Sequence, residues 1–306
     1  MGHRCPVVIP CAMCLAVVTR VVGAAPSRMT AADVGEGSTM EQQDWASAGI
    51  DTERPSAARI YDYWLGGAHN FEADRQVAQQ MLVAYPDGRQ KVWANRAFLR
   101  RAVEFLVGAG VRQFLDIGSG VPTVGHVHEI AQGLAPDSRI VFVDIDPVAV
   151  AHSQMILAGN DRTAAIQEDV RRPERILESA DVQRLFDLTE PVAVLVVALF
   201  HFIPDEDDPV GIVSRLTGPL ATGSYLAVSH ATEDRQDLET GRELYRRVGI
   251  DTAVRSRTQV EALFVDHDLV DPGVVWGPLW RPESPDDVFY HQPEASAFYA
   301  GVGRKR

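Results

Sequence analysis

The sequence predicts an α/β protein built on a mostly parallel β-sheet with helices on both faces. From residue 111 onward, short apolar runs alternate with helical segments, which is the pattern of repeated βαβ units. The run 192–200 contains no polar residue, as expected of a central strand that is buried on both faces. In sheets of this kind the crossovers are right-handed, and ligands bind beyond the carboxyl ends of the strands.

The stretch 113–120, with the sequence QFLDIGSG, begins this pattern. Its apolar residues predict a first buried strand, and its glycines allow a sharp turn and a close approach of the backbone to a ligand. A second apolar run, 140–143, ends in Asp144 and Asp146. A strand, a glycine turn, a helix and a second strand with a terminal acid form the layout of a nucleoside site, in which the acid accepts hydrogen bonds from ribose hydroxyls.

The other elements follow from apolar periodicity, helix caps and helix breakers. Helices are expected over 127–134, 147–157, 173–186 and 209–220, and within the polar region 233–263. Strands are expected over 163–167, 192–200 and 224–229, with short β segments within 264–280 and 297–301. Polar residues stand at the predicted strand ends, namely Asp116, Ser119, Asp144, Asp146, Asp169, His201 and His230. Their shared position predicts one site at this edge of the sheet.

Three more helices are expected before the first strand, over 56–65, 72–84 and 87–107. We interpret the segment 54–110 as an N-terminal helical lid, followed by the sheet domain over 111–306. The first two helices carry closely spaced aromatic and charged residues, among them Arg59, Tyr63 and Arg75. Two interpretations stay open: the aromatic residues form a core beside a solvated charged face, or they close over a ligand together with an arginine.

Residues 1–53 differ from the rest, and we expect a disordered or mis-annotated extension that leads into a polar linker. An apolar stretch after Arg4 superficially matches a secretory signal, but prolines interrupt it and it is too broken for a membrane span. The alternative is an upstream start codon, with the true start at Met29 or Met40. The spacing of Cys11 and Cys14 has no second pair that would complete a zinc site.

The composition narrows the possible partners. Of the 306 residues, 46% are hydrophobic and 23% are charged, and the net charge of −13 argues against nucleic acid or an anionic membrane as the main partner. All three cysteines lie in the first 14 residues, so we expect a cytoplasmic protein without a thiolate site in its folded body. No metal site is expected, because His126 and His128 point apart on a helix and the acidic run 205–208 is typical of a solvated loop. The sequence does not indicate an oligomeric state.

Two cofactor classes use this layout, and the glycine turn distinguishes them. A nicotinamide or flavin cofactor needs a helix N-terminus for its pyrophosphate and normally a third glycine. Here Thr123 holds the place of that glycine, Pro122 removes a backbone N–H group, and Asp116 would lie near the phosphates. S-adenosylmethionine (SAM) is a cation without phosphate and avoids these conflicts. A nicotinamide-dependent oxidoreductase is kept as the alternative.

Several motifs resemble those of a known family. The segments DIGSG (116–120), VDIDP (143–147) and EDVR (168–171) are similar to the cofactor motifs of Rossmann-like, class I SAM-dependent methyltransferases. More specific segments resemble the actinobacterial SAM-dependent methyltransferase family long catalogued as a domain of unknown function: ARIYDYWLGGAHNFEADR (58–75), NRAFLRRAV (95–103), LVVALFHFIPDEDDP (195–209) and FYAGVGRK (298–305). The resemblance covers the chain from about residue 54 onward and implies a mostly parallel, seven-stranded sheet.

The resemblance also implies roles for single residues around SAM. The methionine portion would be surrounded by Asp116, Gly118, Ser119 and Gly120. Asp144 would hold the ribose hydroxyls, with Asp146 as a near alternative that is also a plausible helix cap.

The adenine and the methyl group have implied contacts as well. Asp169 would accept a hydrogen bond from the adenine amino group, with the Val170 backbone beside it. Ala198 and His201 would line the cofactor next to the transferred methyl group. From the lid, Arg59 and Tyr63 are expected to contact the cofactor.

The implied reaction is methyl transfer from SAM to a small-molecule acceptor. It needs in-line positioning and exclusion of water, and an acidic nucleophile would also need a general base. His201 and Tyr63 are the candidate catalytic residues, with His230 as a further possible base. A SAM-binding protein without transferase activity would keep the same motifs and is the second alternative, and a nucleic-acid methyltransferase would need a basic stripe that the sequence lacks.

Overall fold

The computed structural model describes residues 51–122, 125–234 and 238–306. All of them belong to one compact unit, Trp45–Arg306. The expectations for residues 1–50, including the three cysteines and the possible starts at Met29 and Met40, lie outside the described residues, and so does Thr123. Within the described part of the chain, no helix has the length and apolar composition needed to cross a bilayer.

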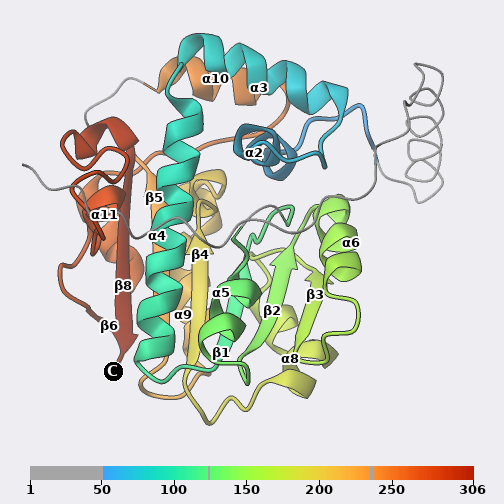
Figure 1. The fold of residues 1–306 in the computed structure, drawn as a ribbon, viewed down its shortest axis with the longest axis vertical. Helices are drawn as coiled ribbons and strands as arrows, with labels where there is room; N and C mark the ends of the chain where they lie inside the picture. Colours follow the sequence, from blue (N-terminus) through green and yellow to red (C-terminus); the bar gives the residue numbers. More distant parts are fainter. Residues whose placement is uncertain (1–50, 123–124, 235–237) are drawn as a thin grey trace, which may run out of the picture. The chain divides into compact units, whose positions relative to one another are not determined.

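The centre of the fold is a mixed sheet whose strands are ordered β3-β2-β1-β4-β5-β8-β6, with β7 paired to β8 off this path (Figure 1). The strands are β1 (Gln113–Ile117), β2 (Arg139–Asp144), β3 (Thr163–Gln167), β4 (Val192–Val197), β5 (Tyr225–Ala231), β6 (His267–Leu269), β7 (Val275–Trp276) and β8 (Phe298–Lys305). Strands β1 to β5 are parallel, and β8 runs antiparallel to its three partners. The expected mostly parallel sheet is confirmed: seven strands form the continuous path, and the two-residue β7 adds an eighth.

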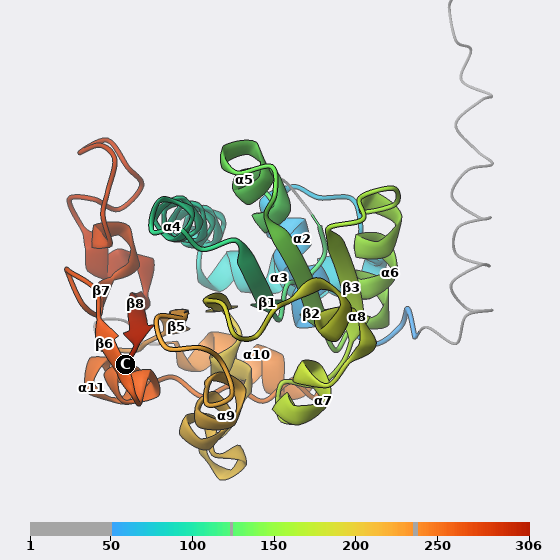
Figure 2. The ribbon, with the colours of Figure 1, turned by 90° about the horizontal axis from the view of Figure 1, so that it is seen from below.

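Helices cover both faces of the sheet (Figure 2). The α-helices are α2 (Ala57–Leu65), α3 (Glu72–Ala84), α4 (Gly88–Gly108), α5 (Val127–Leu134), α6 (Pro147–Ile156), α7 (Pro173–Leu177), α8 (Ala180–Leu185), α9 (Pro209–Thr217), α10 (Glu239–Arg247) and α11 (Arg257–Glu261). Short 3₁₀ segments are η1 (Phe200–Phe202), η2 (Asp205–Asp207), η3 (Ala262–Phe264), η4 (Gly277–Leu279) and η5 (Pro293–Ser296).

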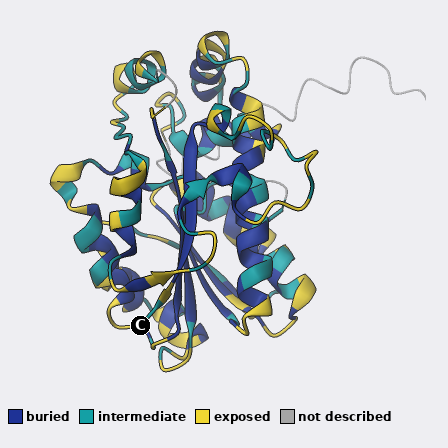
Figure 3. Cartoon of the chain, turned by 90° about the vertical axis from the view of Figure 1, so that its left-hand side faces the viewer, coloured by how far each residue is buried: buried dark blue, intermediate teal, exposed yellow. Residues whose placement is uncertain are grey.

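Two hydrophobic clusters lie on opposite faces of the sheet. Phe114 packs in the cluster that holds buried residues of α4, α5 and α6, whereas the adjacent Leu115 packs in the cluster of α7, α8 and α9. Neighbouring residues of a strand point to opposite faces, so a run that is apolar throughout is buried on both sides. Figure 3 shows the result as a buried sheet between helices whose outer surfaces are exposed.

Most predicted spans agree with the structure, and those at 72–84, 127–134 and 163–167 match to the residue. The strand predicted over 192–200 ends earlier, at Val197, because Ala198 takes a left-handed backbone conformation with φ 58°. The β segment predicted over 297–301 is longer than expected. As β8 it pairs along the whole of β5, from Tyr225 opposite Arg304 to Ala231 opposite Phe298.

Helices α2, α3 and α10 form a roof beyond the carboxyl ends of β1, β2 and β4 (Figure 1). Ile60, Val77 and Met81 make a small core of their own, against which Leu244 and Tyr245 of α10 pack. The roof therefore combines two distant segments of the chain, although the lid was expected from residues 54–110 alone. Helix α4 connects the roof to the sheet, since its buried residues from Ala94 to Val107 belong to the core of one sheet face.

Candidate functional site

A cavity of about 490 Å³ lies between this roof and the carboxyl ends of the parallel strands. Eight of the predicted site residues line it, namely Asp116, Gly118, Ser119, Gly120, Asp144, Asp146, Ala198 and His201. Four others do not line it, namely Arg59, Tyr63, Asp169 and Val170. The cavity thus occupies the position where parallel α/β sheets bind ligands.

The glycine turn after β1 is held against the end of β2. The backbone N–H groups of Gly118 and Ser119 donate to the Val143 carbonyl at 2.8 and 3.1 Å. Both glycines have a positive φ, 69° at Gly118 and 68° at Gly120. A Cβ at Gly118 would also lie 2.8 Å from the Leu199 side chain, whereas a Cβ at Gly120 would meet nothing within 4 Å. Close packing therefore requires the first glycine, and backbone conformation favours the second.

Asp144 ties this turn to the loop after β2. Its carboxylate accepts hydrogen bonds from the backbone N–H groups of Gly120 at 2.7 Å and Asp146 at 2.8 Å. Burial raises the pKa of Asp144 to about 6, although these hydrogen bonds oppose the shift. Each carboxylate oxygen has further lone pairs, so Asp144 can hold the two loops and still accept from a ligand in the cavity.

Asp116 faces the cavity without a protein partner. It is 6% exposed, and its carboxylate makes no hydrogen bond or ion pair with the described residues. Burial raises its pKa to about 7; the charge of Arg96 opposes this rise and the charge of Asp144 adds to it. A buried carboxylate without a partner is costly, so its position indicates a cationic or hydrogen-bonding ligand.

Arg96 lines the same cavity, and its positive charge acts on the carboxylate of Asp116. Its guanidinium lies over the ring of Tyr61, 5.9 Å from the centroid, and its Nε is buried without a hydrogen-bond partner. Among the residues that the structure describes, none forms an ion pair with it. The cavity therefore holds a free guanidinium and a free carboxylate, which together match the two charges of an amino-acid group.

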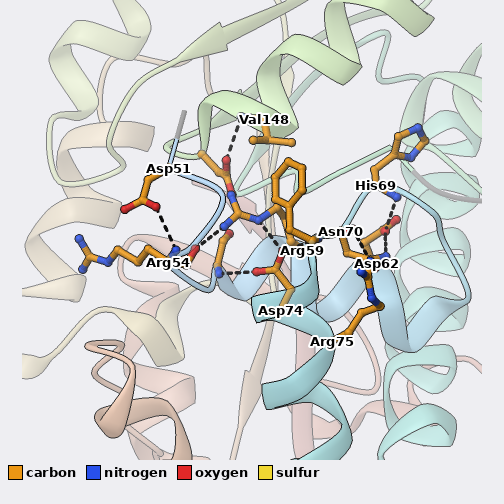
Figure 4. Close-up of polar contacts among 12 residues, drawn as sticks. Asp51, Arg54, Arg59, Asp62, His69, Asn70, Asp74, Arg75 and Val148 are labelled. Atoms are coloured by element: carbon orange, nitrogen blue, oxygen red, sulfur yellow. Dashed lines mark hydrogen bonds and ion pairs between the residues drawn. The ribbon is translucent and has the colours of Figure 1, made fainter. Parts of the chain in front are cut away.

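The motif at 58–75 holds the roof together and attaches it to the sheet (Figure 4). The buried Arg59 donates from Nε to Asp74 at 2.8 Å and from Nη1 to Asp146 at 3.2 Å. Asp146 also caps α6 by accepting from the Val148 N–H at 2.8 Å. The guanidinium of Arg59 is thus engaged by two carboxylates, and Asp146 joins helix α6 to the roof.

A second part of this motif closes the loop between α2 and α3. Asp62 accepts hydrogen bonds from the His69 N–H at 3.0 Å and from the Asn70 side-chain amide at 2.8 Å (Figure 4). A Cβ at Gly67 would lie 1.9 Å from Asp62 Oδ1, so only glycine leaves room for this contact. The charged residues of the motif are largely paired within the roof, an arrangement that neither interpretation of the sequence anticipated.

Tyr63 belongs to this motif but lies outside the cavity wall. Its hydroxyl accepts from Gln79 Nε2 at 3.3 Å, and the guanidinium of Arg89 lies 5.1 Å from its ring centroid. The neighbouring aromatic residues Tyr61 and Trp64 line the cavity instead.

Asp169 and Val170 follow β3 at the edge of the sheet. Arg171 donates to Asp169 at 2.7 Å and also pairs with Asp207 at 3.3 Å. Burial alone would raise the pKa of Asp169, but the hydrogen bonds from Arg171 hold it below its ordinary value. Val170 is buried in the core. The adenine contacts implied for these two residues stay predictions.

His230 at the end of β5 has both ring nitrogens in use. Arg255 Nη1 lies 2.7 Å from His230 Nε2, and an arginine can only donate, so Nε2 is the acceptor. Nδ1 then carries the proton and donates to the Ala231 carbonyl at 2.7 Å. His230 therefore has no lone pair left to take a proton from a ligand.

His201, after β4, differs from His230 in this respect. Its ring makes no hydrogen bond with the described residues, and its Nδ1 is buried without a partner. Burial, with the nearby His230 and Arg255, lowers the pKa of His201 to about 3. The imidazole is neutral at physiological pH and retains an unused lone pair on the cavity wall.

A chain of hydrogen bonds fixes the backbone at Ala198. Asn95 on α4 donates to the Tyr61 hydroxyl at 3.0 Å and accepts from Ser229 Oγ at 2.6 Å. Ser229 Oγ in turn accepts from the Ala198 N–H at 3.0 Å. A left-handed conformation at a non-glycine residue is strained, and here the surrounding bonds hold it at the site.

Sequence reasoning assigned no role to Asn95, Arg96, Tyr245 or Arg255. One available signal was position, because Asn95 and Arg96 share the helical stripe of the buried Val92, Leu99 and Val103. Polar residues on an apolar stripe indicate a site or a buried network. Arg255 lies in an irregular segment, where no periodicity marks it.

Within residues 51–122, 125–234 and 238–306, no three His, Cys, Asp or Glu side chains are grouped so that they could hold a metal ion.

Comparison with known proteins agrees with the site. The S-adenosyl methyltransferase family matches this chain over residues 43–306. A solved structure of a DUF574 family protein from Streptomyces avermitilis has 41% identity and a TM-score of 0.80, covering 84% of this chain and 100% of that chain. A structure of a methyltransferase candidate from Thermobifida fusca has 38% identity and a TM-score of 0.80, covering 86% of this chain and 99% of that chain. No curated protein matches the sequence. The chain therefore belongs to the S-adenosyl methyltransferase family and is a SAM-dependent methyltransferase with a Rossmann-like class I fold.

Proposed function

We propose that this enzyme binds SAM in the cavity under the roof and methylates a small-molecule acceptor there. The observation that carries the proposal is the buried, unpartnered carboxylate of Asp116 on the cavity wall, which needs a ligand of the charge and polarity that SAM has. The cavity volume of about 490 Å³ and the net charge of −13 favour a small acceptor over a nucleic acid.

The residues present fit the cofactor along its length. Asp144 would accept from the ribose hydroxyls, because its oxygens face the cavity next to the glycine turn. Asp116 would accept from the α-ammonium group, and Arg96 would donate to the α-carboxylate. Open space beside Gly120 leaves room for the chain between them.

Bound SAM supplies an electrophilic methyl group on a sulfonium. The residues of the protein bind and orient the cofactor and the acceptor, and they exclude water from the cavity. The fixed backbone at Ala198 and Leu199 forms part of the wall at the end of β4. The neutral imidazole of His201 can accept a hydrogen bond from the acceptor, and its lowered pKa of about 3 makes it a weak base. Tyr63 would need a change of position to take part, since it lies outside the cavity wall.

Calorimetric titration of the full chain with S-adenosylhomocysteine (SAH) tests the proposal. We expect micromolar binding by the wild type and a loss of at least about tenfold in Asp144→Ala, because charged hydrogen bonds to the ribose are removed. Asp137→Ala is the matched control: it deletes an exposed carboxylate, paired with Arg112, at the same change in net charge. Unchanged binding in Asp144→Ala would refute the site, and binding of NADH in place of SAH would refute the cofactor.

Arg96→Met is expected to weaken SAH binding by about 10- to 100-fold, because a charge-assisted pair contributes about 1.5–3 kcal/mol. The same change should leave adenosine binding nearly unaffected, because adenosine lacks the amino-acid group. Arg89→Met is the control, since Arg89 lies over Tyr63 outside the cavity. Equal losses for SAH and adenosine would instead indicate a general distortion of the cavity.

A further inference from the structure

The roof of the cavity is aromatic and apolar. Tyr61 and Trp64 of α2, Met81 of α3 and Tyr245 of α10 line it. Phe202 continues this wall, and its ring meets that of Tyr245 edge to face with centroids 5.7 Å apart. Flat rings in offset or edge-to-face packing favour a planar aromatic ligand.

The charges of the cavity are segregated. Its carboxylates lie on the floor, at Asp116, Asp144 and Asp146. Two cations that line the cavity are paired: Lys91 of α4 with Asp87 at 3.3 Å, and Arg242 of α10 with Glu239 at 3.3 Å. Arg54 also lines the cavity, and its guanidinium forms no ion pair with the described residues, so the wall offers an acceptor one cation besides Arg96.

One polar group stands between the floor and the roof. The ring of His201 lies 5.8 Å from that of His230 on the sheet and 4.3 Å from that of Phe202 at the roof. None of the described residues uses either of its nitrogens. A neutral imidazole on an apolar wall, with a donor and a lone pair unsatisfied, matches a ligand hydroxyl that can donate as well as accept.

We propose that the methyl acceptor is an aromatic compound with a hydroxyl group, its ring under the aromatic roof and its hydroxyl hydrogen-bonded to His201. This inference rests on the proposed function and names the substrate class of that site. During transfer the hydroxyl oxygen forms a bond to the methyl carbon, while the carbon–sulfur bond breaks and its electron pair stays on sulfur. His201 accepts the hydrogen bond of the hydroxyl group, and the hydroxyl proton is released to water. The positive charge lost at sulfur leaves with that proton, so the charges of the step balance.

Binding to the full chain saturated with SAH tests the inference, with 2-naphthol and 2-methoxynaphthalene as probes. The two share their rings, but only the naphthol can donate a hydrogen bond. We expect the wild type to bind 2-naphthol about tenfold more tightly, the value of one hydrogen bond. We expect His201→Phe to abolish that preference and His201→Gln to keep part of it. His291→Phe, at an exposed histidine, is the control and should behave as the wild type.

Three outcomes would overturn the inference: equal affinity for both probes in the wild type, a preference for charged 2-naphthoate, or no binding of any probe. SAH affinity is measured in the same samples. If SAH binds and the hydroxyl preference is absent, only the acceptor class is refuted. If SAH fails to bind, the proposed function itself is refuted.

Discussion

Asp116→Asn is expected to stabilise the cofactor-free enzyme at pH 8 and to weaken its binding of SAH. The pKa of Asp116 is raised to about 7 in the folded protein, chiefly by burial, whereas the pKa of an aspartate in an unfolded chain is about 3.9. Between these values the folded state binds more protons than the unfolded state. The contribution of Asp116 to stability therefore falls as the pH rises through this window, and the loss is complete above about pH 7.

The stabilisation by Asp116→Asn should accordingly grow by roughly 2–3 kcal/mol between pH 5 and pH 8 and then level off. Urea unfolding of both proteins at several pH values measures it. Asp137→Asn, at an exposed carboxylate, should show no such growth. SAH affinity should fall about 10- to 100-fold in Asp116→Asn, because the partner of the ammonium group is neutralised. A stability difference independent of pH would show that Asp116 titrates normally in the folded state.

Arg255→Met is expected to lower the free energy of unfolding by about 3–5 kcal/mol. The guanidinium is 4% exposed and donates to the carbonyls of Phe200 and Ile203, both at 2.9 Å, and to His230 Nε2 at 2.7 Å. Methionine fills a similar volume but leaves these three buried acceptors without a donor. Since the same bonds shape the loop that carries His201, we also expect SAH to bind more weakly in the cavity.

Arg257→Met is the matched control for Arg255→Met. Arg257 pairs with Glu261 at 2.9 Å, but both side chains are exposed, so its loss should change stability by less than about 1 kcal/mol. Arg255→Lys keeps the charge without the planar fork and should recover only part of the stability. Similar urea midpoints for Arg255→Met and Arg257→Met would mean that the buried hydrogen bonds contribute little.

The sheet was predictable because each of its parallel strands is a short apolar run with a clear boundary. The glycine turn after Ile117 and the acid at Asp144 mark chemistry that is local in sequence, and the structure brings both to one cavity. By contrast, α10 is a mostly charged helix, and its role depends on Leu244 and Tyr245 meeting α3 far away in the chain. Local patterns carry no information on such a contact.

The motif at 58–75 shows that local sequence patterns also do not predict which side chains face the site. Arg59 and Tyr63 were expected at the ligand because aromatic and charged residues cluster there. The structure pairs Arg59 with Asp74 and Asp146, and it directs Tyr61, two positions before Tyr63, to the cavity. One helical turn contains several polar residues, and tertiary packing decides which of them faces the site.

The position of β8 within the sheet affects how the protein folds. This strand lies between β5 and β6, so residues 298–305 fill an interior place beside a strand that ends at residue 231. During synthesis, β1 to β5 leave the ribosome first and expose the open edge of β5 until β8 has been made. Pairing over such a separation is slow, and an uncovered apolar edge invites association with other chains. The nascent enzyme thus passes through a stage in which prompt arrival of its last strand competes with aggregation.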